Sequence, residues 1–248
     1  MTAVPSQTTI DELDSKGFKN LKLWARGIDI TRFSPSYADS NLRKQWSPDG
    51  DPIALFVGHL VLEKDIETLL KAYQILKSRN IKFKLVLVGG GPMKSKIEKM
   101  EPDVIITGHL EGEELSKAYA SADLFVFPST TESFGNVVLE AAASGLPIIG
   151  AAEGGVKDLI SDGETGFLTE PKDPLDFAMK AEEVIINTDL RNSLATNALN
   201  YAVKQSWDEI NNGLFDQYRY LIDMYKSGLS TEADNINNRS QSINRLKN

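Results

Sequence analysis

The middle of the chain alternates short apolar runs with amphipathic stretches. Ile53–Val57 is a continuous apolar run that ends at Gly58, which is the pattern of a strand buried on both faces. Apolar residues then recur at helical spacing from Ile66 to Leu76. The same reasoning predicts strands at 83–88, 104–106, 124–127, 147–150 and 167–168, and helices at 113–120, 136–144 and 155–160. This alternation predicts an α/β fold, a Rossmann-like parallel sheet with helices on both faces.

The two ends of the chain follow other patterns. After Pro174 the pattern is helical, with helices predicted at 175–186, 190–205 and 207–225. Near the start, Thr8 or Thr9 is expected to cap a short helix that Gly17 closes, and a strand is expected at 21–24. Residues 36–51 are polar and rich in turn residues. We expect four parts: 1–35 as a remnant of a preceding domain with its linker, 36–205 as the Rossmann-like domain, 206–226 as a separate helix, and 227–248 as a disordered tail.

Composition narrows the classes of function. The 248 residues include 27 Lys and Arg against 35 Asp and Glu, a net charge of −8, which argues against a nucleic-acid partner because such proteins need a basic face. The absence of cysteine removes disulfide and thiolate chemistry and fits a reducing compartment. No apolar run approaches the roughly 18 residues of a membrane span, and no signal peptide is visible. We therefore expect a cytoplasmic location, with peripheral contact at the inner membrane face left open through a region outside this chain.

Glycines lie where the predicted strands end. Ligands of such sheets bind at the carboxyl ends of the strands, and Gly58, Gly89–Gly91 and the loop after Pro128 are all placed there. The cluster Gly89–Lys94 does not form G-x-G-x-x-G and no Walker A lysine motif is present, so generic Rossmann oxidoreductases and P-loop nucleoside triphosphatases are excluded. Gly91 opens a helix whose backbone N–H groups can meet an anion. A tight turn explains the same glycine equally well.

Two glutamates stand eight positions apart around the next helix start. Gly135 and the N–H groups of Asn136 and Val137 open that helix, so its positive end can face an anionic diphosphate. In the preceding loop, Glu132 can meet sugar hydroxyls beyond the phosphates. On the inner face of the helix, Glu140 can accept from both hydroxyls of a ribose. Taken singly, the first glutamate can instead be a helix cap and the second a solvated charge.

The combination resembles a known signature. Glu-x7-Glu in the context E-S-F-G-N-V-V-L-E-A, followed by S-G-L-P, is similar to that of glycosyltransferase family 4, retaining enzymes of the two-domain GT-B fold. The resemblance runs from about Arg26 to Tyr225, and Arg26–Asp29 with Phe33–Pro35 resembles the interdomain linker of a subgroup that includes lipid-directed mannosyl- and sulfoquinovosyltransferases. Further motifs follow in the family's order at Phe56–Leu60 with Glu63 and Lys64, Val88–Pro92, Gly108–Leu110, Ala122–Ser129 and Asp162–Leu168.

The resemblance implies the C-terminal, donor-binding half of a GT-B enzyme. Such an enzyme would transfer a hexose from GDP-mannose or a UDP-hexose to a lipid or glycan acceptor, and most of the acceptor domain is not in this chain. It implies two catalytic residues, with Lys64 neutralising the diphosphate and Glu132 contacting the transferred sugar, while Glu140 holds the ribose. The remaining donor-binding residues implied are Gly58, His59, Gly91, His109, Leu110, Ser133, Phe134, Gly135, Asn136 and Val137, and the helix 206–226 resembles the segment that crosses back to the N-terminal domain.

The same resemblance implies that neither a cofactor nor a metal ion is needed. Attack by the acceptor from the face of the departing diphosphate requires no enzyme nucleophile, so catalysis should depend on stabilising developing negative charge. The two histidines stand fifty residues apart in the sequence, without an acidic cluster beside them. A non-catalytic nucleotide-sugar-binding module and a subunit of a split enzyme remain alternatives, whereas the Glu-x7-Glu context argues against a sugar-nucleotide epimerase of the same fold.

One position departs from the family pattern. The family usually has arginine where this chain has His59, so the implied clamp on the diphosphate becomes His59 with Lys64. A neutral histidine is a weaker phosphate partner than arginine. A bound diphosphate can stabilise the protonated ring and so recruit the proton. An inert histidine in the loop is the other interpretation.

Overall fold

The computed structural model describes residues 2–226, and the disordered tail predicted at 227–248 lies outside them. The chain up to Trp207 forms one compact unit, and the residues from Asp208 on belong to a second. The four parts drawn from the sequence, and the boundaries between them, stay predictions.

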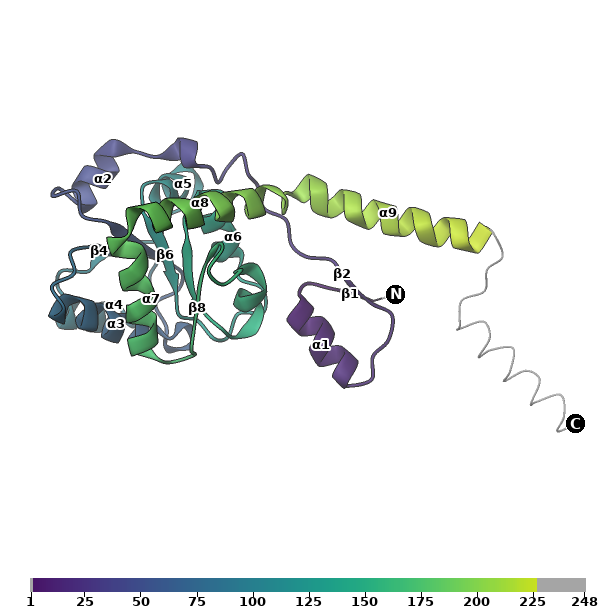
Figure 1. Cartoon of the computed structure of the whole chain (residues 1–248), viewed down its shortest axis with the longest axis horizontal. Coiled ribbons are helices and arrows are strands. Elements are labelled where there is room, and N and C mark those ends of the chain that lie inside the picture. The colour runs from purple at the N-terminus through teal and green to yellow at the C-terminus, as the bar shows by residue number, and fades with distance from the viewer. Residues whose placement is uncertain (1, 227–248) are drawn as a thin grey trace, which may run out of the picture. The chain divides into compact units, whose positions relative to one another are not determined.

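A six-stranded parallel sheet is the centre of the first unit (Figure 1). The strand order is β5-β4-β3-β6-β7-β8, and every neighbouring pair is parallel. All five residues of β3 are buried, which confirms the interpretation of its unbroken apolar run. The order reverses between β3 and β6, the point at which sheets of this kind bind ligands. The strands are β3 (Ile53–Val57), β4 (Lys84–Val88), β5 (Ile105–Gly108), β6 (Leu124–Phe127), β7 (Ile148–Ala151) and β8 (Gly166–Thr169).

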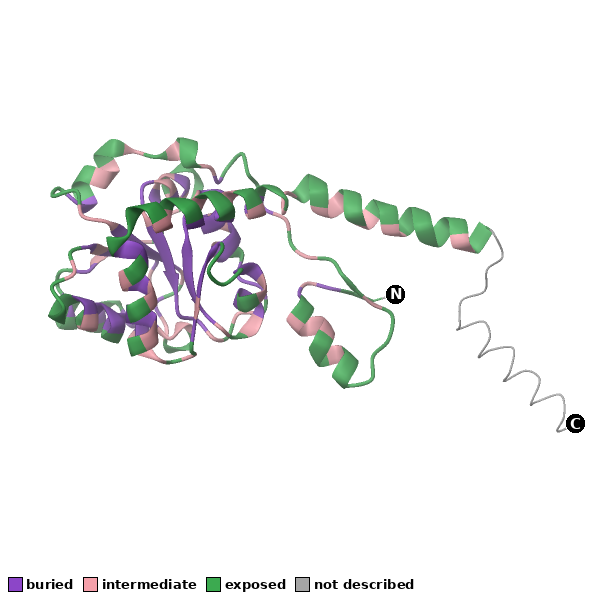
Figure 2. Cartoon of the chain, viewed as in Figure 1, coloured by how far each residue is buried: buried purple, intermediate pink, exposed green. Residues whose placement is uncertain are grey.

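Helices cover both faces of the sheet. On one face α3 packs against α7, and on the other α6 packs against α5 and α8. Right-handed crossovers require this division, because the connections run in opposite directions from the centre of the sheet. Most residues of the strands between them are buried, whereas the edge strand β5 is of intermediate burial (Figure 2). The predicted fold class is thus confirmed. The helices of this unit that follow β3 are α3 (Ile66–Ser78), α4 (Lys94–Met100), α5 (Gly112–Ala120), α6 (Asn136–Ala143), α7 (Pro174–Ile186) and α8 (Thr188–Val203), with 3₁₀ turns η2 (Leu62–Lys64) and η3 (Gly154–Leu159).

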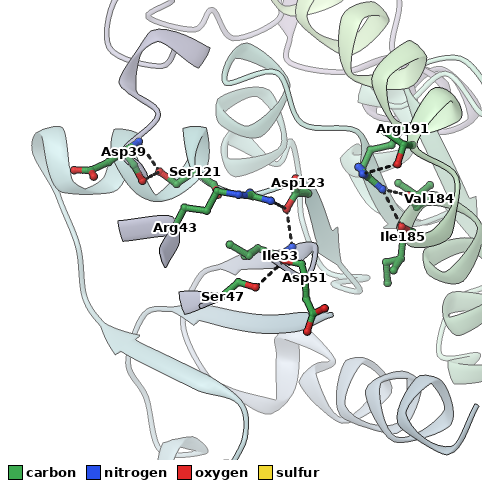
Figure 3. Close-up of polar contacts among 11 residues, drawn as sticks. Asp39, Arg43, Ser47, Asp51, Ile53, Ser121, Asp123, Val184, Ile185 and Arg191 are labelled. Carbon is green, nitrogen blue, oxygen red and sulfur yellow. Dashed lines mark hydrogen bonds and ion pairs between the residues drawn. The ribbon is translucent and has the colours of Figure 1, made fainter. Parts of the chain in front are cut away.

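The segment 36–51, read from the sequence as polar and turn-rich, contains a helix. This helix, α2 (Ser40–Trp46), follows the 3₁₀ turn η1 (Pro35–Tyr37), and the Asp39 carboxylate caps it by accepting from two backbone N–H groups. Arg43 pairs with Asp123 at 2.8 Å, and Asp123 also accepts from the Ile53 backbone N–H at 2.8 Å (Figure 3). These side-chain contacts attach α2 to the amino ends of β3 and β6.

The start of the chain folds as a small β-α-β unit. The strand β1 (Thr2–Val4) pairs in parallel with β2 (Leu21–Leu23), and α1 (Gln7–Ser15) connects them. The predicted cap at Thr8 or Thr9 is wrong, because the Ser6 side chain accepts from the Thr9 N–H. The Thr8 hydroxyl and N–H instead donate to Asp158 at 2.9 Å each, which attaches α1 to η3.

Two features close the first unit. The Arg191 guanidinium of α8 donates to the carbonyls of Val184 and Ile185 at 2.9 Å, so it caps the end of α7 (Figure 3). Helix α8 ends two residues earlier than predicted, at Val203, and the carbonyl of Gln205 accepts from the Ile28 N–H at 2.8 Å. The linker segment is thereby held beside the end of α8.

Helix α9 (Trp207–Lys226) begins the second unit and follows the predicted 207–225 closely. None of its residues is buried in the part of the chain that the structure describes. Large apolar side chains stay exposed along it, namely Phe215, Tyr218, Tyr220, Leu221, Ile222 and Tyr225. The role of this helix as a crossing segment remains a prediction.

Candidate functional site

The loops that follow β3, β4 and β5 pack backbone against backbone. The Gly58 N–H donates to the Val88 carbonyl at 3.0 Å, and the Gly89 N–H donates to the Gly108 carbonyl at 2.8 Å. A Cβ atom placed on Gly89 would lie 2.0 Å from the Gly58 carbonyl oxygen, so no side chain fits there. The glycines therefore bring three strand ends together at one edge of the sheet. At Gly91 a Cβ atom would lie 2.5 Å from the Leu60 oxygen, so this position is packed too closely for a side chain, whether or not its N–H also meets an anion.

The loop after β6 is shaped by glycines on both sides. Gly135, at φ 92°, takes the left-handed conformation needed immediately before α6. From η3, the Gly155 N–H donates to the Glu132 carbonyl at 2.7 Å. A Cβ atom on Gly155 would lie 2.3 Å from the Ser133 carbonyl oxygen, so the two segments are in close backbone contact. The side chain of the next loop residue, Phe134, is buried. The loop that carries Glu132 is thus held against η3, with the amino end of α6 directly after it.

Lys64 and Glu132 form an ion pair across this edge of the sheet. The lysine ends η2 after β3, and its ammonium donates to the Glu132 carboxylate. Both side chains are less than a quarter exposed, at 23% and 22%. The Thr131 hydroxyl also donates to the Glu63 carbonyl at 3.1 Å, which ties the same two loops together. The two residues that the resemblance marks as catalytic therefore contact each other.

Glu140 is held from behind by a tyrosine. The Tyr119 hydroxyl, on α5, donates to Oε2 of Glu140 at 2.8 Å, and Tyr119 is fully buried. Burial raises the pKa of the Glu140 carboxyl above its ordinary value, while the hydrogen bond from Tyr119 and the charge of Arg32 oppose part of that rise. Burial and the neighbouring carboxylate raise the pKa of Tyr119 well above its ordinary value, so the phenol stays a donor at neutral pH.

A groove of about 190 Å³ opens in front of Glu140. Both histidines line it although they are fifty residues apart in the sequence, and the His109 side chain is 81% exposed. Six of the sequence-predicted residues meet here, namely Gly58, His59, His109, Leu110, Val137 and Glu140. Lys64, Gly91 and Glu132 through Asn136 lie outside the lining of this groove. The lining of this groove includes His59 and does not include Lys64, so the joint clamp of the two residues on a diphosphate stays a prediction.

A second cavity, of about 220 Å³, also has Glu140 in its lining. Its walls are the linker from Arg26 to Phe33, the start of α6 with Asn136, and Trp207. Glu140 lines both cavities, and it is the carboxylate whose pKa the linker residue Arg32 lowers. The linker is thus part of the surroundings of Glu140.

Several residues that build the site were not identified from the sequence. Tyr119 is one position in a predicted helix, Gly155 is the first residue of the predicted helix 155–160, and Gly154 carries no prediction. A Gly-Gly pair after a buried strand is a signal of close backbone approach and could have marked the second case. Nothing in the sequence links Tyr119 to a glutamate 21 positions away.

Between residues 2 and 226, no group of three or more His, Asp or Glu side chains is arranged to hold a metal ion. No helix in this range combines the length and the apolar character that crossing a membrane demands.

The fold and the strand-end groove define a Rossmann-like α/β domain of the kind found in GT-B glycosyltransferases. Residues 38–201 match the family described as Glycosyl transferases group 1, and the chain belongs to this family. It is 38% identical over 222 residues to a GDP-mannose-dependent alpha-mannosyltransferase of Corynebacterium glutamicum, covering 89% of this chain and 52% of that protein. It is 35% identical to the sulfoquinovosyl transferase SQD2 of Arabidopsis thaliana, over 84% of this chain and 42% of that protein. The chain spans about half the length of the curated relatives it matches. The family and the subgroup inferred from the sequence are confirmed.

Solved structures show the same fold. Sucrose-phosphate synthase from Thermosynechococcus elongatus matches with a TM-score of 0.77 at 26% identity, over 89% of this chain and 58% of that one. Anabaena HepE, solved in complex with UDP and glucose, matches with a TM-score of 0.75 at 24% identity, over 88% of this chain and 62% of the HepE chain.

Proposed function

We propose that this chain binds the nucleotide-sugar donor of a retaining glycosyltransferase, with GDP-mannose as the first candidate and a UDP-hexose as the second. One observation carries the proposal: Glu140, the Lys64–Glu132 pair and the amino end of α6 all lie at the carboxyl edge where the strand order reverses. Because relatives are named GDP-mannose-dependent alpha-mannosyltransferases, we rank a guanine nucleotide ahead of a uracil nucleotide as the donor of this chain.

In this proposal the donor lies along the edge with its parts in a fixed order. The base enters the groove beside His109 and Leu110, and Glu140 accepts from the ribose hydroxyls. The diphosphate meets the N–H groups at the start of α6 and draws Lys64 away from Glu132. Once released, the Glu132 carboxylate can accept from hydroxyls of the hexose.

Catalysis would then depend on the charge of the leaving group. As the bond from the sugar to the diphosphate breaks, negative charge grows on the phosphates, and the Lys64 ammonium and the α6 dipole stabilise it. These groups supply the positive charge that the reaction requires, so the proposed mechanism is metal-independent. The acceptor, a lipid or a glycan, would attack from the same face, with no enzyme nucleophile. Its binding surface and any contact with a membrane are assigned to regions outside the described residues.

Calorimetric titration with GDP-mannose, GDP and UDP-glucose tests the proposal. We expect binding of at least one diphosphate and a large loss in Glu140→Gln, with Glu98→Gln on exposed α4 as the matched control. An assay of donor hydrolysis, run in parallel, separates an active domain from a module that binds without turnover. If none of the three ligands binds the parent protein, the proposed function is wrong.

A further inference from the structure

Tyr119 is a buried polar residue that the proposed chemistry does not use. Its side chain is fully buried on α5, among aromatic rings: it meets Phe33 edge-on at 5.7 Å and Phe125 at 5.8 Å between ring centroids. Phenylalanine would fill this space without a hydroxyl group to desolvate. The hydroxyl therefore has a role beyond packing.

The partner of that hydroxyl among residues 2–226 is the Glu140 carboxylate, which lines the groove. The hydroxyl donates to Oε2 of Glu140 at 2.8 Å, from a helix that precedes β6 to a helix that follows it. A glutamate on a helix has three rotatable side-chain bonds, and a hydrogen bond from a rigid, buried phenol removes much of that freedom. The carboxylate thus meets a ligand in a set orientation and does not have to be ordered at the moment of binding.

The surroundings of Glu140 combine opposing influences on its charge. Burial disfavours the carboxylate, while Tyr119 from α5 and Arg32 from the linker both favour it. Arg32 also lies over the Phe33 ring at 5.3 Å, and Phe33 packs against Tyr119. The support of the carboxylate therefore extends from the linker through two aromatic rings to α5.

We propose that Tyr119 is a positioning residue that orients the Glu140 carboxylate toward the two ribose hydroxyls, and so makes the site selective for ribonucleotide over deoxyribonucleotide diphosphates. The inference rests on the proposed function, because it assumes that a nucleoside diphosphate occupies the groove. Tyr119 itself does not touch the ligand. Its effect is transmitted entirely through Glu140.

The first test compares GDP with 2′,3′-dideoxy-GDP, or the corresponding uridine pair if UDP binds more tightly. Tyr119→Phe should weaken binding of the ribonucleotide about tenfold, the factor expected for a moderate coupling between contacting side chains. Binding of the dideoxy form should not change, because it lacks the hydroxyls that Glu140 would accept from. Tyr73→Phe is the matched control, since it removes another buried tyrosine hydroxyl, on α3, against the Phe83 ring.

The second test is the pH profile of ribonucleotide affinity. Glu140 accepts from both hydroxyls when it is ionised, so this affinity is present above its pKa and is lost as the pH falls through it. The hydrogen bond from Tyr119 lowers the pKa of Glu140. Removing this bond should therefore raise that pKa and move the loss of affinity to higher pH. His59 and His109 line the same groove, but the parent protein and the Tyr119→Phe variant both contain them. Their contribution to the pH profile therefore cancels when the two profiles are compared. A packing defect that lets water reach Glu140 would reduce the effect of burial, lower the pKa of Glu140 and move the midpoint to lower pH, the opposite direction.

The outcomes separate the two claims. If the parent binds the ribonucleotide but Tyr119→Phe keeps its selectivity and its midpoint, the positioning role is wrong while the proposed function stands. If the parent binds neither diphosphate, the proposed function fails. Should Tyr119→Phe not fold, 3-fluorotyrosine placed at position 119 keeps both ring and hydroxyl. Its fluorine resonance should shift with the ribonucleotide and not with the dideoxy form, and equal shifts with both would overturn the inference.

Discussion

The ion pair between Lys64 and Glu132 occupies the place that the proposed donor requires. Because the ammonium is already bound to a carboxylate, the diphosphate has to compete with Glu132 for it. Lys64→Met removes the cation and leaves an unpaired carboxylate facing the phosphates. Glu132→Gln removes the competitor and leaves the lysine free. The two substitutions should therefore change GDP affinity in opposite directions.

The size of each effect follows from burial. Two unit charges 4 Å apart interact by about 4 kcal/mol at an effective dielectric constant of 20, and hydrogen bonds to charged groups contribute about 1.5–3 kcal/mol net. With both side chains 22–23% exposed, we discount toward the lower values. Lys64→Met should cost about 2 kcal/mol, a loss of roughly 30-fold in affinity for GDP. Glu132→Gln should tighten GDP binding by about 1 kcal/mol, roughly fivefold.

Calorimetric titration with two ligands completes the design. GDP-mannose should not gain from Glu132→Gln, because the same glutamate is proposed to accept from the hexose. High salt should reduce both changes, since the Debye length falls from about 10 Å at 0.1 M to about 3 Å at 1 M. Lys96→Met is the matched control, because Lys96 pairs with Glu67 at 2.6 Å on an exposed surface. If Glu132→Gln weakens GDP binding as much as Lys64→Met does, the two residues do not compete and the reasoning is refuted.

Three further predictions can be checked with the same preparations. His59→Arg should preserve or tighten donor binding at pH 8, and abolished binding in a titration would show that this position is not part of a phosphate clamp. Gly89→Ala should lower the free energy of unfolding by about 3 kcal/mol or more in urea, because its Cβ atom would lie 2.0 Å from a backbone oxygen. Gly90→Ala, which meets nothing within 4 Å, should change it little, and equal losses would contradict the close-packing argument. Asp123→Ala should cost about 2–4 kcal/mol in the same assay, since it leaves the buried Ile53 N–H without its acceptor and removes the ion pair of Arg43. An unchanged unfolding midpoint would show that this contact contributes nothing.

Local patterns were sufficient for the central sheet. The apolar run Ile53–Val57 is buried on both faces, and the glycines after it mark a true strand end. Chain order alone then places Glu132 and Glu140 at the carboxyl edge, because every strand in the described sheet is parallel. What the sequence predicted about the site is therefore its location.

Elements held by distant contacts were missed. Helix α2 has seven residues, too few to show a clear helical period, and it is stabilised by the pairing of Arg43 with Asp123, 80 positions later. The strand β1 has three residues and exists only beside β2. The Tyr119–Glu140 and Lys64–Glu132 contacts are of the same kind, joining side chains 21 and 68 positions apart. A periodic pattern carries no information about such pairs.

The reversal of strand order has a consequence for synthesis of the chain on the ribosome. The wholly apolar strand β3 pairs with β4 on one edge and β6 on the other, and Ala54 meets Leu124 about 70 positions later. At 5–20 residues per second, that edge waits roughly 4 to 14 s for its partner. In the interval, the sheet β5-β4-β3 presents an unpaired, hydrophobic border, the kind of surface that joins other nascent chains. Early folding of this protein should therefore depend on chaperone cover until residue 127 has emerged.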